Sequence, residues 1–174
     1  MFKDISNFSN INDYLPILNG ILLSDIIIIF IMYYTPYINS NILMKWYEDF
    51  GLSGVIADVC SVLLIGFVLT RYIYTKMEWE WNPLKFLLLF LIIQIIHDLL
   101  FYLFFSSVPR GLNRMLDLFK DYAKEHSYRA ILGDSFMIII AVITAMLFAN
   151  YSLNTNIIIL IVLIYLVPYL IYTR

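Results

Sequence analysis

Five stretches of predominantly apolar residues, each about twenty residues long, constrain the fold of this 174-residue chain more than any other feature. An α-helix rises 1.5 Å per residue, so about 20 residues cross the roughly 30 Å hydrocarbon core of a bilayer. We therefore predict one membrane domain over residues 1–174, in which five helices span the bilayer. The predicted spans are 14–34, 51–72, 84–105, 131–150 and 156–172.

The overall composition excludes a water-soluble fold. Hydrophobic residues make up 62% of the chain and charged residues 14%, whereas soluble domains are about 45–50% apolar and about 25% charged. A soluble protein of this size cannot hide so much apolar area from water. A transmembrane β-barrel would need alternating apolar and polar residues, and apolar runs such as 26–31 do not alternate. The predicted fold class is an all-α polytopic membrane protein with a five-helix transmembrane bundle.

The uneven distribution of Lys and Arg predicts the orientation of the spans. The side that holds residues 35–50, residues 106–130 and the C-terminus carries seven of the eleven basic residues, and the side of the N-terminus carries four. Cytosolic loops of membrane proteins carry an excess of Lys and Arg. We therefore expect a cytosolic C-terminus and a lumenal or external N-terminus.

The cytosolic segment between the third and fourth spans, residues 109–128, has the pattern of an amphipathic helix. Apolar residues recur at helical spacing on one face, while charged residues of both signs occupy the other. Pro109 suits the first turn of such a helix. Because the polar face is mixed in sign, strong attraction to anionic lipid is not expected. We predict that this helix lies in the membrane interface or packs over the cytosolic mouth of the bundle.

Acidic residues inside the predicted spans are the most informative feature for function. A charged side chain at the centre of a bilayer costs roughly 2.5–3.5 kcal/mol, so each one needs a partner, water or a proton. The direction of each span places all four intramembrane aspartates at mid-membrane or in the cytosolic half, where they can converge. The predicted intramembrane polar cluster consists of Asp25, Asp58, Gln94, His97, Asp98 and Asp134.

Stripes of small residues predict which helix faces point into the bundle. Asp134 begins a stripe on the fourth span, and Asp58 belongs to a similar stripe on the second. Small residues let helix backbones approach closely in a membrane. Asp58, Asp98 and Asp134 are therefore expected to face the bundle interior and not lipid. The stripe residues are Ile138, Ala141, Ala145 and Ala149 on the fourth span, and Gly51, Gly54 and Ser61 on the second.

Three interpretations of the polar cluster are open. In the first, buried aspartates hydrogen-bond to neighbouring side chains or backbone and fix the helix register. In the second, crowded carboxyl groups form a cation or proton site, to which His97 adds a group that titrates near neutral pH. In the third, His97 and carboxylates bind a divalent metal. Adjacent residues on a helix point about 100° apart, so His97 and Asp98 do not face one partner squarely.

Motifs of known enzymes are missing from the chain. It contains no nucleotide-binding loop, nucleophile elbow, HExxH or CxxC pattern, so we assign no catalytic residue and no cofactor, and expect no enzymatic activity. The net charge of −2 does not favour nucleic-acid binding. The partners to expect are the lipid bilayer, further copies of the chain and other membrane proteins.

Residues 51–150 carry a resemblance to a known group of proteins, through the segments 97–105, 109–125 and 131–135. These segments resemble uncharacterised multi-spanning membrane proteins encoded by large nucleocytoplasmic DNA viruses of algae and other protists. The resemblance implies a virion membrane or an infected-cell membrane, and transfers no catalytic residue. The expected function is a structural or assembly role in a viral or organellar membrane. The alternative is a small ion or proton channel or transporter, or an intramembrane metal site, that uses the Asp/His cluster.

Overall fold

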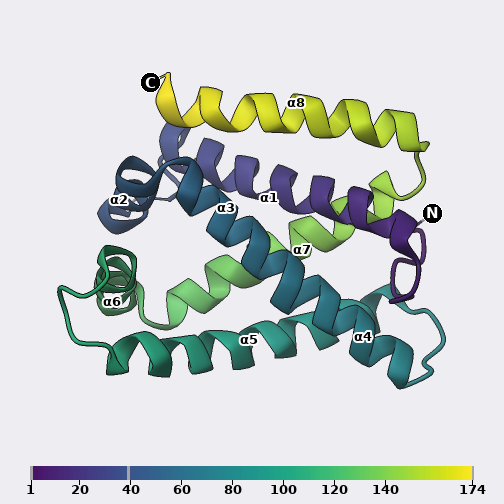
Figure 1. Ribbon diagram of the computed structural model, residues 1–174, viewed down its shortest axis with the longest axis horizontal. Helices are drawn as coiled ribbons and strands as arrows, with labels where there is room; N and C mark the ends of the chain where they lie inside the picture. The colour runs from purple at the N-terminus through teal and green to yellow at the C-terminus, as the bar shows by residue number, and fades with distance from the viewer. Residues whose placement is uncertain (1, 39, 174) are drawn as a thin grey trace.

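The computed structural model describes residues 2–38 and 40–173, which form a bundle of helices (Figure 1). Five of these helices are long and apolar enough to cross a membrane, which confirms the all-α, five-span fold class. They are α1 (Tyr14–Tyr34), the continuous helix formed by α3 (Leu52–Ser61), η2 (Val62–Val68) and α4 (Leu69–Lys76), α5 (Pro83–Ser107), α7 (Tyr128–Phe148) and α8 (Leu153–Tyr172). A short helix, η1 (Ile11–Asp13), leads into α1.

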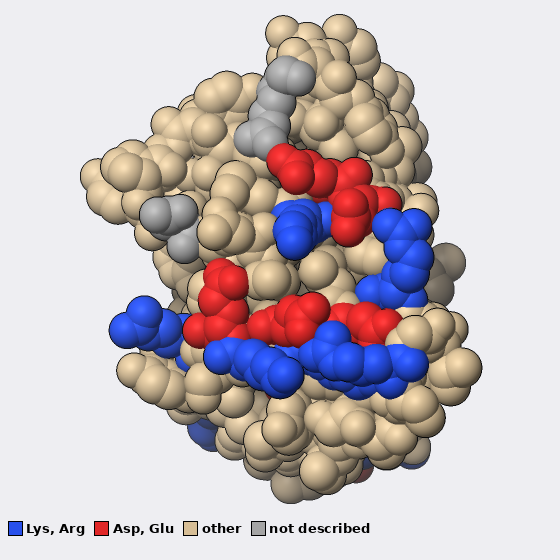
Figure 2. All heavy atoms as spheres, turned by 90° about the vertical axis from the view of Figure 1, so that its left-hand side faces the viewer, with Lys and Arg blue, Asp and Glu red and all other residues tan. Residues whose placement is uncertain are grey.

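Two shorter helices, α2 (Asn41–Phe50) and α6 (Arg114–His126), lie together at one end of the bundle, on the left of Figure 1. We call this end the α2/α6 face, and the opposite end, which holds residues 2–13, the N-terminal face. Figure 2 shows acidic and basic side chains crowded together on the α2/α6 face, between surfaces above and below that consist mostly of other residues. Charged side chains of both signs therefore gather at this end of the bundle.

The helix between the third and fourth spans begins later than predicted. It starts at Arg114, so Pro109 lies outside it. Gly111 has a φ of +89°, which interrupts a right-handed helix, and the Asn113 side chain caps the new start by accepting a hydrogen bond from Leu116 N at 3.1 Å. The helix therefore covers only the later part of the predicted 109–128 segment.

Helix α2 was not predicted. Its N-cap is Ser40, whose Oγ accepts a hydrogen bond from Leu43 N at 3.1 Å. Trp46 and Tyr47 are its buried residues. Apolar residues at helical spacing after a Ser cap were the signal for this helix.

Helix α1 is the most buried span and packs against both α7 and α8. Its contact with α7 is close because Gly20 has no side chain. A Cβ added at Gly20 would lie 2.7 Å from the carbonyl oxygen of Ala141 and 2.8 Å from Ala145 N. The hydroxyl of Thr144 donates to Ile140 O at 2.7 Å and approaches Gly20 O at 3.3 Å. The small residues on α7 therefore let the backbones of α1 and α7 approach closely.

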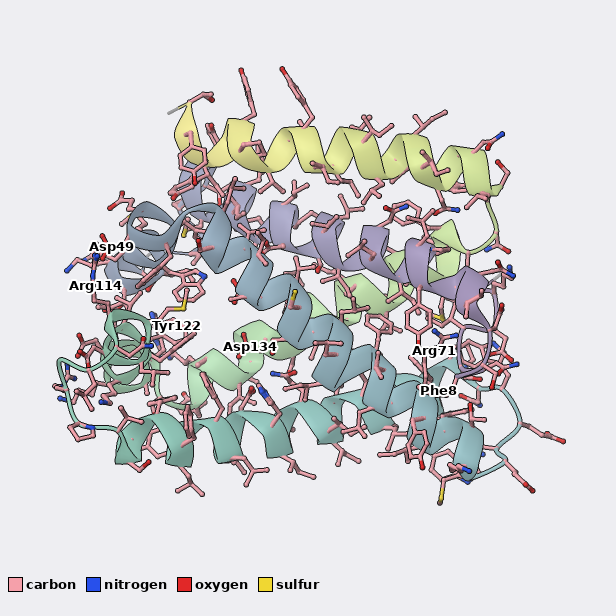
Figure 3. The ribbon with its side chains drawn as sticks, viewed as in Figure 1. Phe8, Asp49, Arg71, Arg114, Tyr122 and Asp134 are labelled. Atoms are coloured by element: carbon pink, nitrogen blue, oxygen red, sulfur yellow. The ribbon has the colours of Figure 1, made fainter. Side chains whose placement is uncertain are left out.

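The N-terminal segment is fixed over its face by a buried ion pair that the sequence did not reveal. Arg71 on α4 has no exposed side-chain surface, and its Nη2 lies 3.2 Å from Asp13 Oδ2. The same nitrogen donates to the carbonyl oxygens of Asn7 and Asn10, and the guanidinium stacks on the Tyr14 ring. Figure 3 shows Arg71 beside this segment. Arg71 is therefore a structural anchor, and not one of the solvated charges at the N-terminal face.

The first prediction concerns the α1–α7 contact. Gly20→Ala should lower the free energy of unfolding by about 1–3 kcal/mol, because the added methyl group meets backbone atoms that cannot move aside. The measurement is the denaturation midpoint of the purified protein in detergent. Gly133→Ala is the matched control, since a Cβ there meets no atom within 4 Å; it should be neutral or stabilise helix α7 by up to about 1 kcal/mol. Equal midpoints for the two variants would contradict the contact.

The second prediction concerns the buried ion pair. Arg71→Met leaves Asp13 buried without its counter-ion, and should cost about 3–5 kcal/mol. Protease cleavage within residues 2–13 should become faster as this segment detaches. The control is Lys76→Met, because Lys76 is exposed and makes only a 5.9 Å contact with the Tyr72 ring. If the protease cleaves both variants at the wild-type rate, Arg71 does not hold the segment in place.

Candidate functional site: an acidic cavity

A cavity of about 1150 Å³ lies at the α2/α6 face. Its walls come from α2, α3, α5, α6 and α7. The volume is slightly above the roughly 300–1,000 Å³ that is typical of small-molecule pockets. Of the predicted cluster, the residues on the lining are Asp58, Gln94, His97, Asp98 and Asp134.

Two of the three lining aspartates have hydrogen-bond donors. Asp58 Oδ2 accepts from Trp46 Nε1 at 2.9 Å. Gly54, one turn before Asp58, leaves room for that indole, since a Cβ at Gly54 would lie 3.0 Å from it. Asp98 Oδ1 accepts from Gln94 Nε2 at 2.5 Å and lies 3.3 Å from His97 Nδ1. These donors fix two of the carboxyl groups on the cavity wall.

The remaining carboxyl oxygens lack donors within the described part of the chain. Asp98 Oδ2 is buried and has no hydrogen-bond partner among residues 2–38 and 40–173. Asp134, on α7, likewise makes no hydrogen bond to a described residue. Arg129 also lines the cavity, but forms no ion pair with the described aspartates. The cavity therefore carries more negative than positive groups that are held in place.

Tyr122 on α6 lines the cavity close to several acidic residues. Burial is the main factor that raises the pKa of the Tyr122 hydroxyl, and the negative charges of Asp134, Asp58, Glu125 and Asp98 raise it further. The hydroxyl therefore stays protonated at neutral pH. Figure 3 shows Tyr122 on α6 and Asp134 on α7. One tyrosine thus feels the charge of aspartates on three different spans.

An aromatic cluster forms part of the cavity wall at the α2/α6 face. The ring of Phe119 on α6 lies 4.9 Å from the Trp46 ring and 5.1 Å from the Phe101 ring. Phe101 also stacks on His97 at 5.8 Å, with the two planes 8° apart. The aromatic wall is therefore continuous with the residues that hold Asp58 and Asp98.

A polar contact joins α2 to the end of α6 beside this cluster. Ser40 Oγ donates to Glu125 Oε1 at 3.0 Å and lies 2.6 Å from His126 Nε2. Together with Phe119 against Trp46, it fixes α6 over the mouth of the cavity. Sequence reasoning missed Ser40 and Trp46 because it predicted no helix over residues 35–50. It missed His126, which lies in the predicted 109–128 helix, because its contact is with Ser40 at the start of α2.

Asp25 does not belong to the cavity lining, although it was predicted as part of the cluster. It is buried in α1, and its Oδ1 accepts a hydrogen bond from the Tyr47 hydroxyl at 3.2 Å. Burial, together with the charges of Asp25 and Asp58, raises the pKa of Tyr47, so the hydroxyl remains a donor at neutral pH. Tyr47 itself lines the cavity, which places Asp25 one residue behind the wall.

A divalent metal is not favoured by this geometry. Within residues 2–38 and 40–173, no group of three His, Cys, Asp or Glu side chains lies close enough to hold a metal ion. Three or more protein ligands are usual in sites that bind metal tightly. The metal interpretation of His97 and the carboxylates therefore finds no support in the described residues.

Comparison with models of protein families, with curated protein sequences and with solved structures finds no match to this chain.

The third prediction tests whether water reaches the cavity. Gly133 lines the cavity next to Asp134, and has open space around its Cβ position. In a Cys60→Ala background, which removes the native exposed thiol, Gly133→Cys should react with a charged methanethiosulfonate at least about ten times faster than Thr70→Cys. Thr70 is fully buried and close to Cys in size. The rate is followed by mass spectrometry, and equal rates would show that the cavity is closed to water.

Proposed function

We propose that this protein is a multi-pass membrane protein that binds a cation in the acidic cavity and acts as a small channel or transporter, without enzymatic activity. The observation that carries the proposal is that Asp58, Asp98 and Asp134, from three different spans, line one cavity. Five apolar helices support the membrane location.

The energetics of the carboxyl groups favour a cation. A carboxylate held away from bulk water without a donor is costly, and a bound cation offsets that cost directly. Asp98 Oδ2 is buried without a donor, and the half-buried Asp134 makes no hydrogen bond to a described residue.

The orientation is part of the proposal. We place the α2/α6 face in the cytosol, because its segments contain six of the ten basic residues that the structure describes. Of the four basic residues on the other side, Arg71 is buried in an ion pair, so it does not act as a free loop charge. The cavity would then communicate with the cytosol, beneath α6.

A structural or assembly role in a viral or organellar membrane is the second candidate. The internal donors found for Asp58 and for one oxygen of Asp98 favour it, because side chains satisfied in this way can serve to fix helix register. The resemblance of residues 51–150 to viral membrane proteins points in the same direction. In this role the partners would be further copies of the chain or other membrane proteins.

The fourth prediction separates the two candidates. In proteoliposomes, the wild-type protein should produce a membrane potential when a gradient of potassium chloride or choline chloride is imposed. Asp98→Asn and Asp134→Asn should each lower the initial rate at which this potential develops at least about tenfold. A tenfold change corresponds to the loss of about 1.4 kcal/mol of charge–charge attraction between the carboxylate and the cation. Asp121→Asn should keep the wild-type rate, because Asp121 pairs with Arg110 in an exposed contact.

The alternative outcome is equally informative. If the wild-type protein carries none of these salts, the channel and transporter function is lost and the structural role remains. In that case Asp98→Asn should change only the stability of the purified protein.

A further inference from the structure

We infer that the acidic cavity is a binding site for an organic cation with an aromatic or apolar body, such as a quaternary ammonium compound. This inference rests on the proposed function and specifies the chemical class of the ligand. The juxtaposition that carries it is the pair of carboxyl groups of Asp134, which has no hydrogen bond to a described residue, and of Asp98, whose Oδ2 is buried without a donor, in a large cavity that aromatic side chains also line.

The size of the cavity excludes a bare inorganic ion as the ligand that fills it. About 1150 Å³ would accommodate a molecule of drug-like size. No three ligating side chains converge within the described residues, so the cavity does not provide the inner coordination shell that a dehydrated metal ion requires. The carboxyl groups of this site are distributed along the cavity wall and do not converge on one position.

The chemistry of the wall favours a cation that keeps little water. Rings of Trp46, Phe101 and Phe119 form one continuous cluster, and the indole of Trp46 is hydrogen-bonded to Asp58. Faces of aromatic rings attract cations, and quaternary ammonium groups are bound in this way. A quaternary ammonium group cannot donate a hydrogen bond. A nearby negative charge can therefore stabilise it without the fixed distance and angle that a hydrogen bond requires.

Asp134 is the residue that we assign to the charge of the ligand. It has no hydrogen-bond donor among residues 2–38 and 40–173, whereas Asp58 and Asp98 each have at least one. Its neighbour Gly133 leaves space beside it, because an added Cβ would meet nothing within 4 Å. The ammonium group would therefore lie near Asp134, and the apolar body would lie against Phe119 and Met137.

The test is isothermal titration of the detergent-solubilised full chain with four probes. Benzyltrimethylammonium carries both the charge and the ring. N,N-Dimethylbenzylamine N-oxide has nearly the same shape with no net charge, tetramethylammonium has the charge without the ring, and potassium is an inorganic cation. Benzyltrimethylammonium should bind at least about ten times more tightly than each of the other three.

Three variants localise the binding. Asp134→Asn should weaken the binding of benzyltrimethylammonium at least about tenfold and leave the binding of the N-oxide unchanged. Gly133→Phe should abolish binding by filling the space, and Gly133→Ala should preserve it. If Gly133→Phe fails to fold, fluorescence of Trp46 in a Trp79→Phe/Trp81→Phe background gives a second readout, because Trp46 is then the only tryptophan and lies on the cavity wall.

The outcomes distinguish this inference from the proposed function. Tight binding of potassium without benzyltrimethylammonium would overturn the inference and leave a cation site in place. Equal binding of the N-oxide would overturn it too, since the cavity would then be a neutral apolar pocket. If no probe binds, the proposed cation site fails as well.

Discussion

The close approach of α1 and α7 at Gly20 is the contact on which the rest of the bundle depends. Lipid tails are as apolar as the helix surfaces, so helices in a bilayer associate through tight packing and not through the hydrophobic effect. With Gly20 against Ala141 and Ala145, α1 occupies the middle of the molecule. Helix α8 then lies along α1 (Figure 1), where Asn19 Nδ2 donates to the carbonyl oxygen of Asn156 at 2.9 Å.

The position of the cavity follows from where the second and third spans touch. Gly66 receives the ring of Phe90, since a Cβ there would lie 2.3 Å from that ring. This contact brings the two spans together toward the N-terminal face. At the α2/α6 face, side chains of these two spans line the cavity, and α2 and α6 cover its opening. Two short helices outside the spans thus complete the wall of a cavity whose carboxyl groups come from the spans.

The sequence allowed the spans to be predicted because each is a continuous apolar stretch, and α1 begins and ends where it was expected. The convergence of Asp58, Asp98 and Asp134 on one cavity could be anticipated from depth alone, since helix rise fixes how far each residue lies from a span end. The position of Asp25 behind Tyr47 could not be anticipated, because Tyr47 belongs to α2, a helix that the sequence analysis did not predict. Arg71 was also beyond reach, since no local pattern connects it to Asp13.

The second span contains a π-helical segment, Val62–Val68, between two α-helical parts. Each residue of a π-helix bonds to one five positions away, so the chain turns through a smaller angle per residue than in an α-helix. The two halves of the span therefore have independent faces. Asp58 faces the cavity from the first half, and Arg71 faces the N-terminal segment from the second. One continuous span thus carries two separate polar surfaces, one on each side of the π-helical segment.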